Sequence, residues 1–494
     1  MTDSDARNTI HGGANDASRT EREGVRTAAV SGTPAGAGPK TVGDGEGPTG
    51  SGGRAFRSDS TGHATVHRVA KLVVFTVAIG AVIGLSAGLL FLALEGVQIL
   101  SMGHSEDPSH PGPDGVPAWR IVASLAAAGI IAAVAWYFLR GRCRHVPSVA
   151  KAVRGDDMPP VPTVVHVLLQ IFIVGAGVSV GRETAPRELG AMVGQKFGRR
   201  VRLDEHDMRL VVAAAAGAGF AGVYDSPFAG MFFAVEMLLV SAHWDVVAVS
   251  LGASCVSAFT AGFFRGRDAF YVLPAGVSFT PSLVVFAAVS APLWGIVGGL
   301  FRRGNQWASA RHARGSAILW MLPCAALLTA TVAVAFPQVC GNGRAAAQLA
   351  FSASQTSESV GALVAVLLAL AALKSALTLL TIRAGASGGV ITPAIAIGAC
   401  LAAALGLGWS CLFPADTVAS CALMGAAAVL ASSQQAPLMA TCLIMELCHL
   451  PADLALPIGL CSVIATLVAR WLMSRLPAVT ELPTVVEMAS RKHQ

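Results

Sequence analysis

The sequence predicts an all-α integral membrane protein, and three features carry that prediction. Of its 494 residues, 54% are apolar and 13% are charged, whereas about a quarter of the residues in a soluble domain are charged. Apolar runs recur along most of the chain. A pattern of small residues, polar loop, proline, apolar helix and glutamate also occurs twice, 210 residues apart. Together these features indicate a bundle of membrane helices built from two related halves.

The apolar runs differ in length and are often interrupted. They cover residues 67–100, 119–139, 163–180, 209–223, 227–242, 246–264, 282–301, 316–336, 359–382, 390–413 and 437–474. Several fall short of the ~20 residues that a straight membrane span needs, and 53 glycines and 25 prolines interrupt the chain. Such segments are typical of helices that end inside the bilayer, where their ends line a cavity rather than meet lipid.

Composition divides the chain into three parts. Residues 1–64 are rich in Gly, Ser, Pro and Thr, which predicts a disordered tail. We expect the membrane domain at 65–476, with one repeat at about 70–265 and the other at about 280–476, followed by a short tail at 477–494. Basic clusters at 139–145 and 198–202 are expected to be cytosolic anchors. The modest net charge of +6 does not support nucleic-acid binding.

The repeat aligns two pairs of segments. Residues 217–238 match 427–448, so that Pro227 corresponds to Pro437 and Glu236 to Glu446. Upstream, "GRETAPRELGA" at 181–191 has a partner in "GGVITPAIAIGA" at 388–399. In duplicated transporter folds the substrate site lies where the repeats meet, near the middle of the membrane. The sequence alone leaves open whether the two halves are inverted.

Both upstream segments are predicted helix starts, since each has glycine before the helix and proline within its first turn. The first N–H groups of a helix lack internal partners and together carry a partial positive charge. An anion in the cavity would satisfy them. Two such starts, one from each repeat, would hold a dehydrated anion without a full positive charge, which helps the ion to leave as well as to enter.

Glu183 lies within the first of these helix starts. An ionised carboxylate there competes with a transported anion, and a protonated one loses that advantage and moves away. Because ionisable groups inside membranes are costly and usually functional, we interpret Glu183 as a gate that also accepts protons. The alternative is a helix cap, or an ion pair with the adjacent Arg182.

These segments resemble the CLC family of chloride channels and chloride/proton exchangers, over roughly residues 66–476. "GRETA" at 181–185 stands where the family has Gly-Arg-Glu-Gly-Pro, and "GGVITP" at 388–393 matches its Gly-x-Phe-x-Pro segment. The stretches at 213–237 and 340–351 are similar to further family segments. The resemblance implies a CLC-like inverted repeat of about eighteen helices, many of them tilted or not fully spanning. It also implies a homodimer with one pore in each subunit.

The resemblance further implies the site residues. Glu183 falls on the gating glutamate and on the proton path. The positions expected to bind the anion are Gly181, Arg182, Glu183, Thr184, Gly389, Val390 and Ile391, with Arg144 and His145 in a loop at the inner mouth. In that loop, "GRCRHVPSV" at 141–149, Arg144 stands where the family has an anion-binding serine. Arg144 either attracts anions there or anchors the cytosolic side.

The family's other anion-binding hydroxyl, a tyrosine near the end of the last membrane helix, also has no counterpart. Ala478 or Val479 takes its place, and the three tyrosines of the chain, Tyr137, Tyr224 and Tyr271, lie elsewhere in the sequence. We therefore expect backbone donors to carry more of the anion binding.

The proton route of the family is altered as well. Exchangers carry two adjacent glutamates after the proline helix, and here the pair reads Glu236–Met237. Because Glu236 has a repeat partner in Glu446, we expect both to cap or tie a loop. Proton coupling would then need a water-filled path or another acid. Arg187 and Glu188, next to the gate, are expected to form a local ion pair or to line the outer mouth.

The favoured function is transport of chloride or a similar monovalent anion, channel-like or weakly linked to protons, in a multi-pass protein of a bacterial plasma membrane. A strict chloride/proton antiporter is the main alternative. A fluoride exporter is another, although the methionine usual in the serine loop of such members is not seen. An enzyme is not expected, because HExxH and paired aspartates in apolar runs are missing from the sequence. No cofactor or metal is expected either, since Glu446 and His449 alone make a poor metal site.

Overall fold

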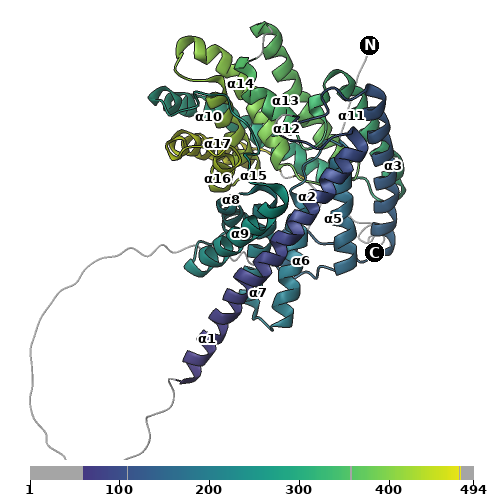
Figure 1. The fold of residues 1–494 in the computed structure, drawn as a ribbon, viewed down its shortest axis with the longest axis vertical. Helices are drawn as coiled ribbons and strands as arrows, with labels where there is room; N and C mark the ends of the chain where they lie inside the picture. The colour runs from purple at the N-terminus through teal and green to yellow at the C-terminus, as the bar shows by residue number, and fades with distance from the viewer. Residues whose placement is uncertain (1–58, 108–109, 356–358, 478, 480–494) are drawn as a thin grey trace, which may run out of the picture. The chain divides into compact units, whose positions relative to one another are not determined.

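The computed structural model describes residues 59–107, 110–355, 359–477 and 479, and within these residues the protein is helical (Figure 1). Across these described ranges, seventeen α-helices are joined by short loops and six π- or 3₁₀-helical segments, against about eighteen helices predicted. The sole β-type pairing in the described residues is a bridge between Gly181 and Gly389. The all-α prediction is confirmed. Most of the two predicted tails, 1–64 and 477–494, lies outside the described residues, although α1 already begins at Asp59.

The helices follow one another in two series. The first contains α1 (Asp59–Val74), η1 (Phe75–Ile79), α2 (Gly80–Met102), α3 (Ala118–Arg142), α4 (Val149–Val153), α5 (Pro160–Gly175), α6 (Thr184–Arg200), α7 (Glu205–Tyr224), α8 (Pro227–Phe232), η2 (Phe233–Leu239) and α9 (Trp244–Arg265). The second contains α10 (Pro281–Ala310), η3 (Gly315–Ala317), α11 (Ile318–Ala335), η4 (Pro337–Val339), α12 (Arg344–Phe351), η5 (Ala353–Gln355), α13 (Val360–Arg383), α14 (Ile391–Leu412), α15 (Val418–Gln434), α16 (Pro437–Leu447), η6 (Ala452–Leu454) and α17 (Ala455–Arg475).

The bundle contains both long and short apolar helices. Eight helical stretches in the described residues are long and apolar enough to cross a membrane, and the first of them runs without a break from Val66 to Met102. Helices α5, α15 and α16 are apolar but shorter. Several of the interrupted apolar runs of the sequence therefore correspond to helices that are short for a straight membrane span.

Glycines allow close packing in two helix pairs, α6 with α7 and α14 with α15. A Cβ atom on Gly190 of α6 would lie 2.3 Å from the carbonyl oxygen of Ala215 on α7. In the second half, a Cβ atom on Gly398 of α14 would lie 2.2 Å from the carbonyl oxygen of Gly425 on α15. Both pairs need glycine at the contact because the backbones approach closely, as is common between membrane helices. The same contact thus recurs in both repeats.

The motif that contains the proline and the glutamate also has the same structure in both repeats. Helices α8 and α16 begin at Pro227 and Pro437, as predicted. The residue that ends the preceding helix, Asp225 in one repeat and Gln435 in the other, adopts positive φ, at 52° and 61°. Each proline follows a tight turn of the backbone, so a new helix begins directly after the turn.

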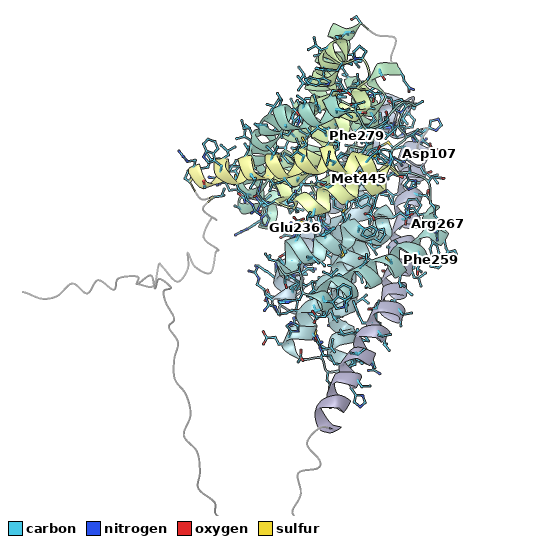
Figure 2. All side chains as sticks on the ribbon, turned by 90° about the vertical axis from the view of Figure 1, so that its left-hand side faces the viewer. Asp107, Glu236, Phe259, Arg267, Phe279 and Met445 are labelled. Carbon is cyan, nitrogen blue, oxygen red and sulfur yellow. The ribbon has the colours of Figure 1, made fainter. Side chains whose placement is uncertain are left out.

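The two motif glutamates cap each other's helices. Glu446 accepts hydrogen bonds from the N–H groups of Phe228 and Ala229, at 2.8 and 2.9 Å. Glu236 accepts from Leu438 and Met439, at 3.3 and 2.9 Å. Figure 2 shows Glu236 where the teal helices of the first series meet the yellow helices of the second. The expected capping role of this pair is confirmed, and it joins the two repeats.

Basic side chains gather where α6 ends and α7 begins. Asp157 pairs with Arg199, with Arg144 at 3.5 Å and with Lys196 at 3.6 Å. We call the surface around Asp157 the basic face. Helix α7 starts directly after α6, and Arg68 of α1 joins its Asp207 to Asp245 at the start of α9. The starts of α7 and α9 and the end of α6 therefore lie on the same side of the bundle.

Candidate anion site

The starts of α6 and α14 meet at a pair of glycines. The N–H of Gly181 donates to the carbonyl of Gly389, and the N–H of Gly389 donates to the carbonyl of Gly181, each at 2.8 Å. Helices α6 and α14 begin three and two residues later, at Thr184 and Ile391. The two helix starts that the sequence predicts therefore converge on one point. The N–H groups of their first turns, which lack partners inside the helix, face this point.

The carboxylate of Glu183 lies at this junction. The side chain is fully buried, and its Oε1 accepts a hydrogen bond of 2.5 Å from the backbone N–H of Ile391. A Cβ atom on Gly389 would lie 2.0 Å from that same Oε1, and one on Gly181 would lie 2.2 Å from Oε2. Only glycine leaves room for the carboxylate at both positions.

Glu183 caps the helix of the opposite repeat. It is the N-cap residue of α6, but its side chain does not cap α6; instead it satisfies the first donor of α14. A negative group at this point is stabilised by the partial positive charge of the helix start. The carboxylate therefore occupies a position that suits an anion.

Two hydroxyl groups complete the surroundings of the carboxylate. The hydroxyl of Tyr224, at the end of α7, lies 3.5 Å from Glu183 Oε2 and 2.8 Å from the hydroxyl of Thr392, the second residue of α14. Tyr224 is thus a hydroxyl beside the gate, and that backbone donors carry more of the anion binding stays a prediction. Tyr224 reaches the junction because α7 ends beside it, which its sequence position does not reveal.

Neither arginine next to the gate pairs with its carboxylate in the structure. Arg182 is buried, and its guanidinium lies over the rings of Tyr224 and Phe270, with distances of 5.4 and 5.0 Å to the ring centroids. Arg187 donates from Nε to the backbone carbonyl of Glu183 at 2.7 Å. The alternative of an Arg182–Glu183 ion pair is thus not supported. The two cations remain close enough to make the site electropositive.

Arg144 and His145 are not brought to the junction. Both side chains are exposed, and Arg144 pairs with Asp157 on the basic face at 3.5 Å. That face includes Arg199, which lies sixteen residues after Glu183 on α6, a rise of about 24 Å. Arg144 is therefore a residue of the rim, where either attraction of anions or anchoring remains compatible with its place. Ser148, one residue after Pro147, is also exposed.

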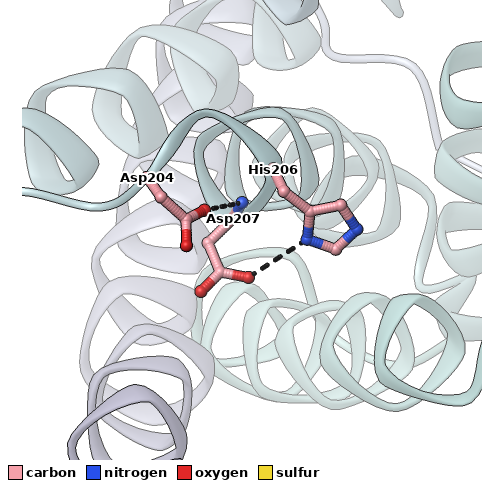
Figure 3. A group of neighbouring side chains, drawn as sticks. All are labelled: Asp204, His206 and Asp207. Atoms are coloured by element: carbon pink, nitrogen blue, oxygen red, sulfur yellow. Dashed lines mark hydrogen bonds and ion pairs between the residues drawn. The ribbon is translucent and has the colours of Figure 1, made fainter. Parts of the chain in front are cut away.

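One group of side chains has the composition of a metal site. Asp204, His206 and Asp207 lie close together at the start of α7 (Figure 3). Asp204 accepts a hydrogen bond of 2.7 Å from the N–H of Asp207, which makes it the cap of α7. Asp207 binds Arg68 through both oxygens, at 2.9 Å or less from its Nε and Nη2. Because a guanidinium already neutralises the buried carboxylate, the group is an ion pair that ties α1 to α7.

Helix starts from two related halves that converge around a buried carboxylate define an anion-transport protein of the membrane. The chain belongs to the voltage-gated chloride channel family, the CLC family, whose model matches residues 123–470. It is 28% identical over 350 residues to the voltage-gated ClC-type chloride channel ClcB of Salmonella typhi, covering 68% of this chain and 80% of the relative. The predicted family is thereby confirmed.

Solved structures show the same fold. A slow cyanobacterial Cl⁻/H⁺ antiporter is 20% identical, with a TM-score of 0.69 over 82% of this chain and 95% of the other. A CLC-type fluoride/proton antiporter is 21% identical, with a TM-score of 0.63 over 81% and 96%. The predicted CLC-like fold is confirmed by this likeness. The spans and the bacterial relatives also confirm a multi-pass protein of the bacterial inner membrane that transports anions.

Proposed function

We propose that chloride or a similar monovalent anion passes the junction of α6 and α14, and that Glu183 gates this step. The observation that carries the proposal is the 2.5 Å hydrogen bond from the Ile391 N–H to the Glu183 carboxylate. An anion that takes this position must displace the carboxylate. Protonation of Glu183 removes the negative charge that the helix start stabilises, so acid favours the anion.

The free N–H groups near the junction are the proposed anion donors. Those of Gly181 and Gly389 are used in the bridge between the repeats, which leaves the amides of Glu183, Thr184 and Val390, together with Ile391 once the carboxylate has left. The hydroxyls of Tyr224 and Thr392 lie beside them. Neutral donors suit transport, because they bind an ion without holding it too tightly.

The substitution Glu183→Gln tests the gate. It keeps the size of the side chain and removes its charge, so we expect purified protein in liposomes to pass chloride at a rate that barely changes between acid and neutral external pH. Glu205→Gln, which changes an exposed carboxylate at the start of α7, should keep the wild-type pH response. If wild type and Glu183→Gln respond equally to acid, Glu183 is not the gate.

Two transport modes agree with this gate. In a channel-like mode the reversal potential follows the anion gradient alone, whereas a strict antiporter shifts its reversal potential with the proton gradient. Met237, in place of the second glutamate of exchangers, favours the channel-like or weakly proton-linked mode. The buried carboxylic acid of Glu188, on α6, favours coupling. Reversal potentials measured with a panel of anions, fluoride included, in a proton gradient separate these modes.

The homodimer remains a proposal based on the family. Chemical cross-linking of the purified protein in detergent, followed by mass determination, tests it directly. A species of twice the chain mass is expected, and a species of a single chain mass at all concentrations would refute the dimer.

A further inference from the structure

A second buried acid lies on α6, five residues after the gate. Glu188 is buried, and its Oε2 is 2.9 Å from Nδ1 of His166 on α5. Gln170, one turn along α5, donates from Nε2 to the same oxygen at 2.8 Å. Of the two roles expected for Arg187 and Glu188, the local ion pair is not formed, since Arg187 turns back to the start of α6. The anion site leaves Glu188 and His166 without a function.

This pair lies between the gate and the basic face. Glu188 is five residues further along α6 than Glu183, a rise of about 7.5 Å towards the end of the helix at the basic face. Helix α5 begins beside that end, because Gln195 of α6 accepts from the N–H of Met158 at 2.9 Å and donates to the carbonyl of Asp156 at 2.8 Å. His166 is six residues into α5, about 9 Å from its basic-face end.

The surroundings of the pair are polar and incompletely satisfied. Among the described residues, Oε1 of Gln170 and Nε1 of Trp136 are buried without a hydrogen-bond partner. The Trp136 ring lies 6.1 Å from the His166 ring, centroid to centroid. The unpaired acceptor of Gln170 and the unpaired donor of Trp136 are groups that water molecules would satisfy.

Charged groups from several elements act on the pair. Arg140 of α3 and Arg187 of α6 attract the Glu188 carboxylate. His145, exposed in the loop before α4, acts on His166. Partial burial, together with the cations Lys151 and Arg140, lowers the pKa of His145 below its usual value.

We propose that His166 and Glu188 form a proton relay between the basic face and Glu183. The proposal rests on the proposed function of Glu183 as a gate that takes up protons. In the relay, imidazolium His166 gives its Nδ1 proton to Oε2 of Glu188, which leaves neutral imidazole and a carboxylic acid. Glu188 then gives its proton through water to Glu183 and becomes a carboxylate again. The His166 ring, which still carries its Nε2 proton, turns so that this N–H faces Glu188, and the ring nitrogen left without a proton takes the next one from the basic face.

The relay would supply an acid where the family resemblance finds one missing. The second position of the glutamate pair is Met237, which packs against the hydrophobic core. Glu236 is also unsuited to the task, because it is held by the start of α16. A proton route through α5 and α6 avoids both positions. It predicts that the protein moves protons as well as anions.

The test measures chloride and proton movement in the same liposomes. With wild-type protein, an outward chloride gradient should drive proton uptake that is stopped by a protonophore. Glu188→Gln should lower proton flux by at least about tenfold, because one proton-carrying group is removed, and leave chloride flux within about threefold. Glu188→Asp keeps a titratable group and should retain part of the proton flux. Glu205→Gln is the control for an acid elsewhere on the chain.

Each outcome separates the relay from the gate. If wild type moves chloride with a pH response but no protons, or if Glu188→Gln moves protons like wild type, the relay is refuted and the gate stands. If Glu188→Gln and His166→Gln run as single species on size exclusion but lose both fluxes, the pair is structural and the relay is again refuted. If Glu183→Gln keeps the wild-type pH response, the proposed gate is refuted, whatever the Glu188 variants show.

Discussion

Individual glycines decide what the junction can contain. At Gly389 a Cβ atom would lie 2.0 Å from Oε1 of Glu183 and 2.1 Å from its carboxyl carbon, so the atoms cannot coexist. The carboxylate is the end of a flexible side chain and would move away. A methyl group would then take the position beside the Ile391 N–H, which excludes both the gate and an anion from it.

Gly389→Ala should therefore impair transport rather than folding. Loss of one hydrogen bond to a charged group costs about 1.5–3 kcal/mol, which corresponds to anion binding weakened by about tenfold or more. We expect chloride flux in liposomes to fall accordingly. Gly408→Ala is the matched control, because it lies in the same helix α14 and a Cβ atom there would meet nothing within 4 Å. Equal flux in the two variants would show that the Gly389 position is not on the anion path.

Sequence reasoning was most successful where local signals specify a residue. Glycine before a helix, proline in its first turn and an acid beside it placed Glu183 at a helix start, and the structure puts it there. Contacts between helices left no such signal. Tyr224 meets Glu183 from 41 residues away and His166 meets Glu188 from 22 residues away, because the rotation of each helix about its axis depends on packing against several neighbours.

At the scale of helices, the repeat acts through exchanged caps. A helix start in a membrane needs partners for its first N–H groups. The start of α14 takes Glu183 from the first repeat, that of α16 takes Glu236, and that of α8 takes Glu446 from the second repeat. The repeat could be found by comparing the two segments of sequence. The exchange could not, since it depends on how the two halves face each other.

Removing either structural cap should destabilise the protein by a similar amount. Glu236→Ala and Glu446→Ala each leave two backbone N–H groups without a partner, at a cost of about 1–3 kcal/mol. We expect both variants to lose the monodisperse species at a lower temperature than wild type on size exclusion after heating. The protein that survives should still show a pH-dependent chloride flux, because the gate is untouched. If this temperature falls in only one of the two variants, the two caps are not equivalent.

At the scale of the whole molecule, the distribution of basic residues predicts how the protein is oriented in the membrane. Arg144, Lys196 and Arg199 lie on the basic face, and Lys and Arg accumulate on the cytoplasmic side of membrane proteins. Helix α9 starts on the side of this face, at Asp245, and crosses the bundle to Arg265. The loop after α9 should therefore face the periplasm. Under this orientation the proposed relay receives protons from the cytoplasm.

Cysteine labelling in cells measures this orientation. Cys143 is exposed next to Arg144 on the basic face, and Asp268 is exposed in the loop after α9. A membrane-impermeant maleimide should label Asp268→Cys in spheroplasts, whose outer membrane has been opened, and should label Cys143 only after the inner membrane is permeabilised. Labelling is assigned by its loss in Cys143→Ser. The opposite pattern would place the basic face in the periplasm, so that protons entering through His166 would come from outside and acid on that side would drive the relay.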